Sequence, residues 1–148
     1  MIIDYTQGME QHIETFILSA EAKALATHSD TGINVVPVSS LAVKDGTIWL
    51  INYFMDKTLS NILSNNHVAL VCWRKMMGYQ IKGEARYVTA GAEFNEAVLW
   101  IHSILPDRIV KGLIILTPKE IYDISPTKDT EEVFLAEQSA GIFTGKTN

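Results

Sequence analysis

A lysine, a hydroxyl and an amide stand at helical spacing in the segment MDKTLSNILSNNHVAL, residues 55–70. Lys57 and Thr58 fall where strand-like residues give way to a helix-like pattern, and Asn61 follows one turn later. If Asp56 is the N-cap, the backbone N–H groups of the first turn have no acceptor within the helix. Such a turn attracts anions through its dipole and its free donors. The segment therefore predicts either a capped helix start with a solvated Lys57 or a phosphate-binding site.

Other residue types that support catalysis or metal binding are scattered along the chain. The four histidines include no pair at metal-binding spacing, and the carboxylates cannot be placed in one cleft. Cys72 is the only cysteine, and its surroundings, VALVCW, are typical of a buried strand. A small buried thiol acts as a core residue, so we expect Cys72 to pack rather than react. We therefore expect no metal site, and we name no catalytic acid or base.

Composition narrows the class of protein. Hydrophobic residues make up 47% of the 148 residues and charged residues 20%, which is typical of a globular protein. We expect one domain over residues 1–148, because a chain of this length buries roughly 70% of its unfolded surface as a single domain. The net charge of -5 argues against nucleic acid as a partner, since phosphate contacts need clustered lysines and arginines.

The sequence also bears on location. No apolar run approaches the ~20 residues that a bilayer span needs. The first residues, MIIDYTQGMEQHIETF, lack the basic region and apolar block of a signal peptide. We therefore expect a cytoplasmic protein without a membrane partner.

The elements that position the lysine and hydroxyl are mainly strands. Apolar residues at helical spacing predict helices at about residues 7–19 and over AEFNEAVLWIHSIL, residues 92–105. Three strands precede residues 55–70, two follow, and IVKGLIILTPKEIYDI supplies a final pair of short strands or one bent strand. Short turns between successive strands favour antiparallel pairing, and about six such strands close best as a small barrel. The expected fold is a mainly β, six-stranded antiparallel barrel with flanking helices.

Two further features concern the second strand and the C-terminal end. Pro37 lies inside the strand INVVPVSSLAV and cannot donate a ladder hydrogen bond, so this strand is expected at an edge or with a bulge. A C-terminal tail is expected from about residue 127, with a short helix over Glu131–Phe143.

The order INVVPVSSLAVKDGTIWLINYFMDKTLSNILSNNHVALVCW, followed by GYQIKGEARYV, is similar to the FMN-binding split-barrel proteins. This family includes pyridoxamine 5'-phosphate oxidase and small flavin-binding proteins. The resemblance covers roughly residues 23–126 and lies in the order and spacing of short motifs. It implies a homodimeric split β-barrel with FMN at the subunit interface, touched by both subunits.

The resemblance also implies which residues hold the flavin. The strand containing VPVSS would run along the ring, Lys57 and Thr58 would bind the FMN phosphate, and Asn61 would join them. Gln80 would offer a polar group near the cofactor. The full implied set is Val38, Ser39, Ser40, Asn52, Tyr53, Lys57, Thr58, Asn61 and Gln80.

The implied function is that of an FMN-dependent oxidoreductase or electron carrier whose substrate and redox partner the sequence does not name. The flavin N5 would exchange hydride while the protein supplies orientation and electrostatics. The arginine and histidine cluster with which the oxidase proper binds its substrate phosphate is not found among Arg74, Arg86 and Arg108. Two alternatives stay open: the same fold binding deazaflavin F420 or haem, and a cofactor-free dimeric binding module. In the second, side chains fill the place of the ring, and the bulky Tyr53, Phe54 and Met55 are the candidates: Tyr53 and Phe54 block the site if they point inward and stack on the ring if they flank it.

Overall fold

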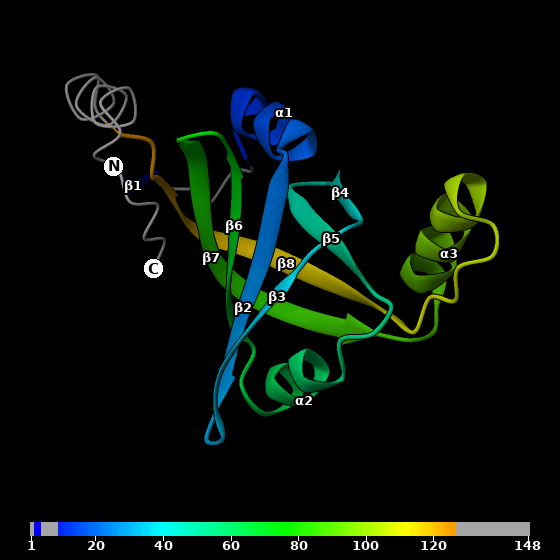
Figure 1. Cartoon of the computed structure of the whole chain (residues 1–148). Helices are drawn as coiled ribbons and strands as arrows, with labels where there is room; N and C mark the ends of the chain where they lie inside the picture. The colour runs from blue at the N-terminus through cyan, green and yellow to red at the C-terminus, as the bar shows by residue number, and fades with distance from the viewer. Residues whose placement is uncertain (1, 4–8, 127–148) are drawn as a thin grey trace, which may run out of the picture.

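The computed structural model describes residues 2–3 and 9–126 (Figure 1). The tail from about residue 127, the helix expected over Glu131–Phe143 and the first residues of the helix expected from about residue 7 lie outside the described residues. In chain order the elements are β1 (Ile2–Ile3), α1 (Gln11–Ser19), β2 (Ala22–Ser29), β3 (Gly32–Pro37), β4 (Leu41–Lys44), β5 (Thr47–Asn52), α2 (Asp56–Ser64), β6 (His67–Arg74), β7 (Met77–Val88), α3 (Ala92–Ile104) and β8 (Gly112–Asp123). Of these residues, none forms a helix that is both long and apolar enough to cross a membrane.

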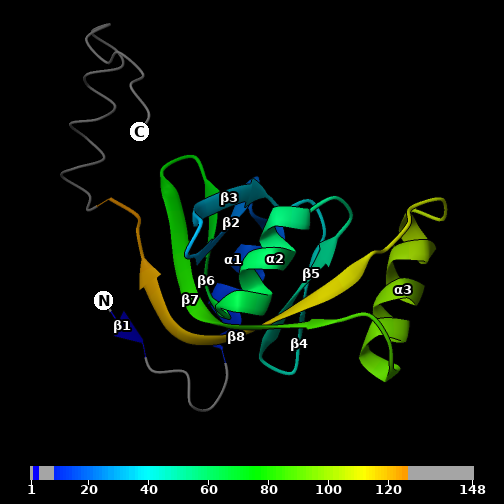
Figure 2. The ribbon, with the colours of Figure 1, turned by 90° about the horizontal axis from the view of Figure 1, so that it is seen from below.

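The strands form one antiparallel sheet in the order β3-β2-β6-β7-β8-β5-β4, with β1 paired to β8. The sheet curls into a barrel, with α1 at one end and α2 at the other (Figures 1 and 2). The predicted mainly β, antiparallel barrel is therefore confirmed. The described strands number eight rather than the predicted six. The segment predicted as one strand is broken at residues 38–40 into β3 and β4, β1 is an extra short strand, and β8 is a single long strand.

Pro37 ends β3, and β3 is an edge strand of the sheet, as the sequence predicted. The break that follows leaves Val38 buried, with its N–H donating to the Lys23 carbonyl at 3.0 Å. Because β3 stops here, the chain turns away from β2 and begins β4 beside β5.

Two apolar clusters hold the fold together. The first fills the barrel with alternate strand residues such as Leu50 and Ile114, closed by Ile17 of α1 and Ile62 of α2. The second lies between α3 and the outer face of β5 and β8, where Trp49 packs with α3 residues. Strand β5 is buried on both faces for this reason, which explains its continuous apolar sequence TIWLIN.

Cys72 lies fully buried in the barrel cluster, as the sequence predicted. Burial raises the pKa of its thiol from 9.0 to about 12, opposed in part by the charge of Lys23. In the folded protein the Cys72 thiol therefore stays neutral at pH values at which the same thiol in the unfolded chain has already ionised. The contribution of Cys72 to stability is complete below the unfolded pKa and falls as pH rises toward the folded one.

We expect Cys72 to resist thiol reagents in the folded protein, because the reactive thiolate is suppressed and the sulfur is covered. At about pH 8, near the ordinary thiol pKa, labelling should proceed only at the rate of unfolding and should accelerate when urea unfolds the protein. Rapid stoichiometric labelling without denaturant would contradict the placement of β6 in the core.

Candidate functional site

The N terminus of α2 begins with a turn that the Asn52 side chain stabilises. The Met55 N–H donates to Asn52 Oδ1 at 2.6 Å, and Met55, not Asp56, occupies the N-cap position. The prediction of Asp56 as N-cap is therefore wrong: Asp56 is the first helical residue, and its carboxylate lies 3.5 Å from Lys111 Nζ. No side-chain hydrogen bond caps this helix. The donors of its first turn consequently remain available for a ligand.

The lysine and hydroxyl of the first turn face the hairpin formed by β2 and β3. Lys57 Nζ donates to Thr31 Oγ1 at the hairpin turn, and its side chain is exposed. Thr58 is fully buried, and its Oγ1 accepts a hydrogen bond of 3.1 Å from Asn34 Nδ2. Lys57 therefore stands at the surface above a buried polar contact between α2 and the hairpin.

Asn61 lies one turn deeper and is fully buried. Its Nδ2 donates to Thr27 Oγ1 at 3.1 Å, while its Oδ1 has no hydrogen-bond partner among the described residues. Leaving a buried polar atom unpaired costs about 1–3 kcal/mol. Because the amide can be turned over and the Thr27 hydroxyl can donate or accept, the same site can instead present an unpaired N–H group. In both orientations one polar group is left for a ligand or a water molecule.

A second set of predicted residues meets at the exit of β5. Ser40 Oγ and Tyr53 Oη are 2.9 Å apart, and Asn52 Nδ2 donates to Tyr87 Oη at 2.9 Å. Asn52 and Tyr53 are buried, at 1% and 6% exposure, whereas the neighbouring Phe54 is 80% exposed. Tyr53 is thus buried in the α3 cluster outside the barrel, and Phe54 is free to meet another molecule.

We expect Asn52→Ala to lower the free energy of unfolding by about 2–4 kcal/mol, because it leaves the Met55 N–H and the Tyr87 hydroxyl without partners. Tyr87→Phe removes only one of these hydrogen bonds and should cost about half as much. Urea unfolding of both variants measures the difference. A loss within about 0.5 kcal/mol for Asn52→Ala, the usual range of surface substitutions, would contradict this role.

Two basic side chains near the end of β5 were not predicted from the sequence to belong to this site. The guanidinium carbon of Arg108 lies 5.0 Å from the Tyr53 ring centroid, and Lys111 Nζ lies 5.6 Å from that of Phe54. Both follow α3, far along the chain, and reach this place because β8 pairs with β5 through Gly112 and Asn52. The N terminus of α2 is consequently flanked by Lys57 on the hairpin side and by Lys111 on the β8 side.

Within a single chain, the other residues that the sequence assigned to the cofactor do not connect the first turn of α2 with the polar residues at the exit of β5. Ser39 is exposed in the link between β3 and β4. Gln80 lies on β7 opposite Val71 and Tyr122. It is five residues, or roughly 17 Å along a strand, before Ala85, which contacts the segment just after α2.

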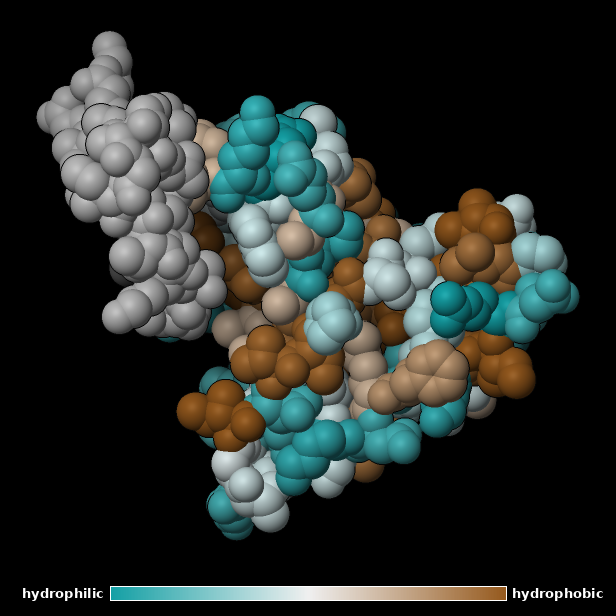
Figure 3. Space-filling view, in the orientation of Figure 1, coloured by the Kyte–Doolittle hydropathy of each residue, from teal (hydrophilic) through white to brown (hydrophobic). Residues whose placement is uncertain are grey.

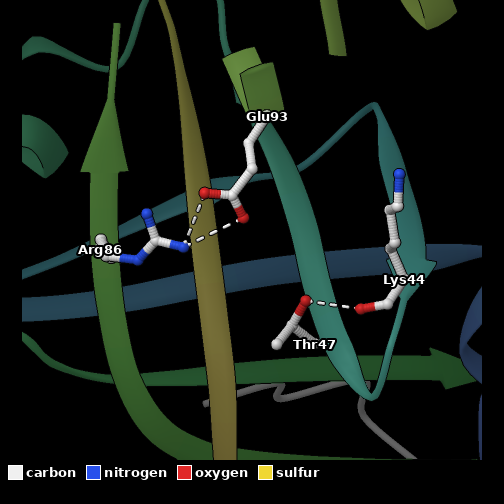
Figure 4. A network of polar contacts seen from close by, with 4 residues as sticks. All are labelled: Lys44, Thr47, Arg86 and Glu93. Atoms are coloured by element: carbon white, nitrogen blue, oxygen red, sulfur yellow. Dashed lines mark hydrogen bonds and ion pairs between the residues drawn. The ribbon is translucent and has the colours of Figure 1, made fainter. Parts of the chain in front are cut away.

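A cavity of about 270 Å³ is lined by residues of α3, β4, β5, β7 and β8, among them Arg86 and Glu93, whose ion pair Figure 4 shows. Its two basic residues are paired with α3 carboxylates: Lys44 with Glu96, and Arg86 with Glu93 at 3.0 and 3.1 Å. No histidine lines it. These pairs leave the cavity without the free cationic cluster that a phosphorylated substrate requires.

A larger cavity, of about 800 Å³, lies on the outer face of the barrel. It is lined by Ala26, Thr27, His28, Ile33, His67, Val68, Ala69, Lys82, Gly83, Glu84, Lys119 and Glu120. None of the residues that the sequence assigned to the cofactor lies in it. Within residues 2–3 and 9–126, no group of three or more histidine, cysteine or acidic side chains is arranged to hold a metal ion.

An antiparallel barrel closed by a helix with an uncapped N terminus defines this chain as a split-barrel domain. The chain belongs to the pyridoxamine 5'-phosphate oxidase family, whose model matches residues 9–128. It is also 30% identical over 142 residues to an uncharacterised protein of Methanocaldococcus jannaschii, an alignment that covers 93% of this chain and 92% of the relative.

Solved structures share the fold. An FMN-binding protein of Syntrophomonas wolfei subsp. wolfei superposes with a TM-score of 0.68 at 16% identity, covering 78% of this chain and 86% of that one. HutZ of Vibrio cholerae, a haem storage protein, superposes with a TM-score of 0.60 at 12% identity, covering 79% of this chain and 95% of that one. Split barrels of this shape are therefore found in proteins that bind different cofactors.

Proposed function

We propose that this protein binds FMN and acts as an oxidoreductase or electron carrier. The observation that supports this most is the uncapped N terminus of α2 with Lys57 beside it, in a chain of the pyridoxamine 5'-phosphate oxidase family. A dianionic phosphate suits free backbone donors at the positive end of a helix dipole together with an ammonium group.

The residues present fit the phosphate of FMN. Lys57 contributes a full charge and the first-turn N–H groups contribute donors, while Lys111, paired with Asp56 at 3.5 Å, offsets the negative charge of that carboxylate. Thr58 and Asn61 lie beneath them, where they join α2 to the hairpin and so fix the direction of the first turn. When bound, FMN supplies the redox chemistry; these residues bind and orient it.

The rest of the predicted set acts as a support for the site. Asn52 holds the turn before α2, and the hydrogen bond between Ser40 and Tyr53 links the start of β4 to the end of β5. We place the ring along residues 38–40, where the break between β3 and β4 leaves backbone that is not committed to the β2 ladder. Phe54, exposed next to Lys111, offers an apolar surface to the electron donor or acceptor.

The experiment is reconstitution of the purified protein with excess FMN, followed by desalting and a visible spectrum. A retained flavin spectrum that saturates at one FMN per chain supports the proposal. Loss of all flavin on desalting, together with no saturable quenching of flavin fluorescence during titration, would overturn it.

Haem is the second candidate, because His28 and His67 both line the outer cavity of about 800 Å³ and imidazole is a common haem ligand. The same reconstitution with haem distinguishes the two, since a haem complex gives a Soret band that His67→Ala shifts or abolishes. Deazaflavin F420 is tested by the same titration as FMN. A protein that retains none of these is a cofactor-free binding module.

We further propose that the protein works as a homodimer in the cytoplasm. The family resemblance implies a cofactor touched by both subunits, and one chain alone leaves Gln80 far from α2. Light scattering of the purified protein measures the oligomeric state directly.

A further inference from the structure

The connection between α3 and β8 is fastened to the end of β5. The Lys111 N–H donates to the Asn52 carbonyl at 3.0 Å, next to the point where β8 begins to pair with β5. The Arg108 N–H donates to the Leu105 carbonyl at 3.1 Å, and the Arg108 carbonyl oxygen lies 2.9 Å from His102 Nε2 on α3. The backbone of Arg108 is therefore held through both its N–H and its carbonyl, which fixes the place from which its side chain reaches the end of β5.

Arg108 places a positive charge over an aromatic ring at the end of β5. Its guanidinium carbon is 5.0 Å from the centroid of the Tyr53 ring. Among the described residues it forms no ion pair with a carboxylate, the adjacent Asp107 included. Leu105 and Ile109 nearby along the chain are exposed and apolar, and apolar surface lies among polar groups at the α3 end of the molecule, at the right of Figure 3. The charge of Arg108 is therefore not neutralised, and its field acts on the ring.

The Tyr53 hydroxyl connects this ring to the start of β4. Tyr53 Oη and Ser40 Oγ are 2.9 Å apart, both side chains are buried, and either hydroxyl can be the donor. A cation over the ring stabilises the negative charge that the phenol oxygen gains when it donates. Donation from Tyr53 to Ser40 is therefore the favoured direction. The Ser40 proton is then left for another acceptor, because a hydroxyl group has only one donor.

Ser40 ends the link, residues 38–40, along which we place the flavin ring. Its carbonyl accepts a hydrogen bond of 3.4 Å from the Ile51 N–H, so its backbone is held against β5. Reduction adds electrons to the flavin, and the charge near its ring nitrogens is one of the properties that a protein can tune. A donor that is polarised by a neighbouring hydrogen bond and a cation stabilises the electron-rich reduced ring more than the oxidised ring.

We propose that Arg108 is a positioning residue that acts on FMN through Tyr53 and Ser40 and makes its reduction potential more positive. The inference rests on the proposed function, because it takes FMN as the ligand, and it adds a means by which the chain sets the potential. A cation that only fastened the connection to β5 would change the stability of the fold. The arrangement proposed here changes the difference between the affinities for reduced and oxidised FMN.

The reduction potential of bound FMN tests this role, since it follows that difference in affinity. It is measured from visible spectra while dithionite reduces the FMN-loaded protein together with a dye of known potential, without oxygen. Arg108→Gln removes the charge and keeps a polar side chain. We expect it to weaken the binding of reduced relative to oxidised FMN by roughly 3- to 10-fold, the size of one hydrogen bond, and so to make the potential more negative. An unchanged potential would overturn the role of Arg108.

Arg74→Gln is the matched control. The Arg74 guanidinium carbon lies 5.2 Å from the centroid of the Phe16 ring, so the contact is of the same kind, but this ring has no hydroxyl group. Arg74 ends β6, and Phe16 belongs to α1, away from the proposed site. The potential should therefore stay at the wild-type value. A shift as large as that of Arg108→Gln would show that the potential follows the net charge of the protein, which would contradict the proposal.

A double-mutant cycle tests the path through the hydroxyl groups. Tyr53→Phe keeps the ring beneath Arg108 and removes the donor to Ser40, so it should shift the potential in the same direction as Arg108→Gln. If Arg108 acts through Tyr53, adding Arg108→Gln to Tyr53→Phe should give little further shift. Fully additive shifts would overturn this path. If Tyr53→Phe fails to fold, Ser40→Ala removes the same hydrogen bond and takes its place in the cycle.

The result also separates this inference from the proposed function. A wild-type protein that retains no FMN overturns the proposed function and, with it, the tuning of FMN by Arg108. A protein that retains FMN, and whose potential is the same in wild type and Arg108→Gln, overturns the inference alone and leaves FMN binding intact.

Discussion

Replacing Lys57 with alanine should lower the affinity for FMN by roughly 10- to 100-fold. A hydrogen bond to a charged group contributes about 1.5–3 kcal/mol, and each 1.4 kcal/mol is about tenfold in affinity. The loss is expected in FMN binding and not in stability, because Lys57 is exposed and its ammonium group donates an exposed hydrogen bond to Thr31 on the hairpin. Titration of flavin fluorescence with each variant measures the effect.

Two controls make this result specific. Lys75→Ala removes another exposed lysine, in the turn between β6 and β7, and should leave FMN affinity unchanged. Riboflavin, which lacks the phosphate, should bind wild type and Lys57→Ala with similar affinity. An FMN affinity that survives Lys57→Ala would place the phosphate elsewhere, with Arg108 and Lys111 as the next residues to replace.

Gly83→Ala should lower the free energy of unfolding by about 3 kcal/mol or more, at the upper end of overpacking substitutions. A Cβ at this position would lie 2.1 Å from the Thr117 carbonyl oxygen and 2.9 Å from its carbon. These are backbone atoms of β8, held by the ladder with β7, so they cannot move aside without breaking it. The irregular register between Lys82 and Gly83, where β8 carries the extra residue Lys119, brings the two strands this close.

Thermal unfolding measures this second effect. A loss of about 3 kcal/mol corresponds to roughly 6–12 °C in Tm for a protein of this size. Glu84→Ala, at the next and exposed position, is the control and should change Tm little. A Gly83→Ala variant with wild-type Tm would show that the close approach of β7 and β8 at Thr117 is not present in solution.

The barrel could be predicted because its signals are local. Alternating burial along β7 and the continuous apolar run of β5 are visible in the sequence, and both follow from which faces of a strand are covered. The break at residues 38–40 was not predicted as a strand end. Pro37 gave the reason for it, but a proline at an edge permits either a bulge or a stop.

The candidate site was predicted less completely because its contacts are between distant segments. Asp56 is a good N-cap by residue type, yet the Asn52 side chain fixes the preceding turn and moves the cap to Met55. The burial of Thr58 depends on the β2–β3 hairpin lying against α2, and the approach of Lys111 depends on the register between β5 and β8. A single sequence encodes neither of these packings in a local pattern.

The proposed roles of Lys57, Thr58 and Asn61 all depend on the N terminus of α2 binding the phosphate of FMN. Calorimetric titration of the wild-type protein with FMN and with riboflavin, under the same conditions, tests it most directly. We predict that FMN binds at least roughly tenfold more tightly than riboflavin, since the phosphate adds a charge-assisted contact of about 1.5 kcal/mol or more. Equal affinities for the two flavins, or no binding of FMN, would contradict it.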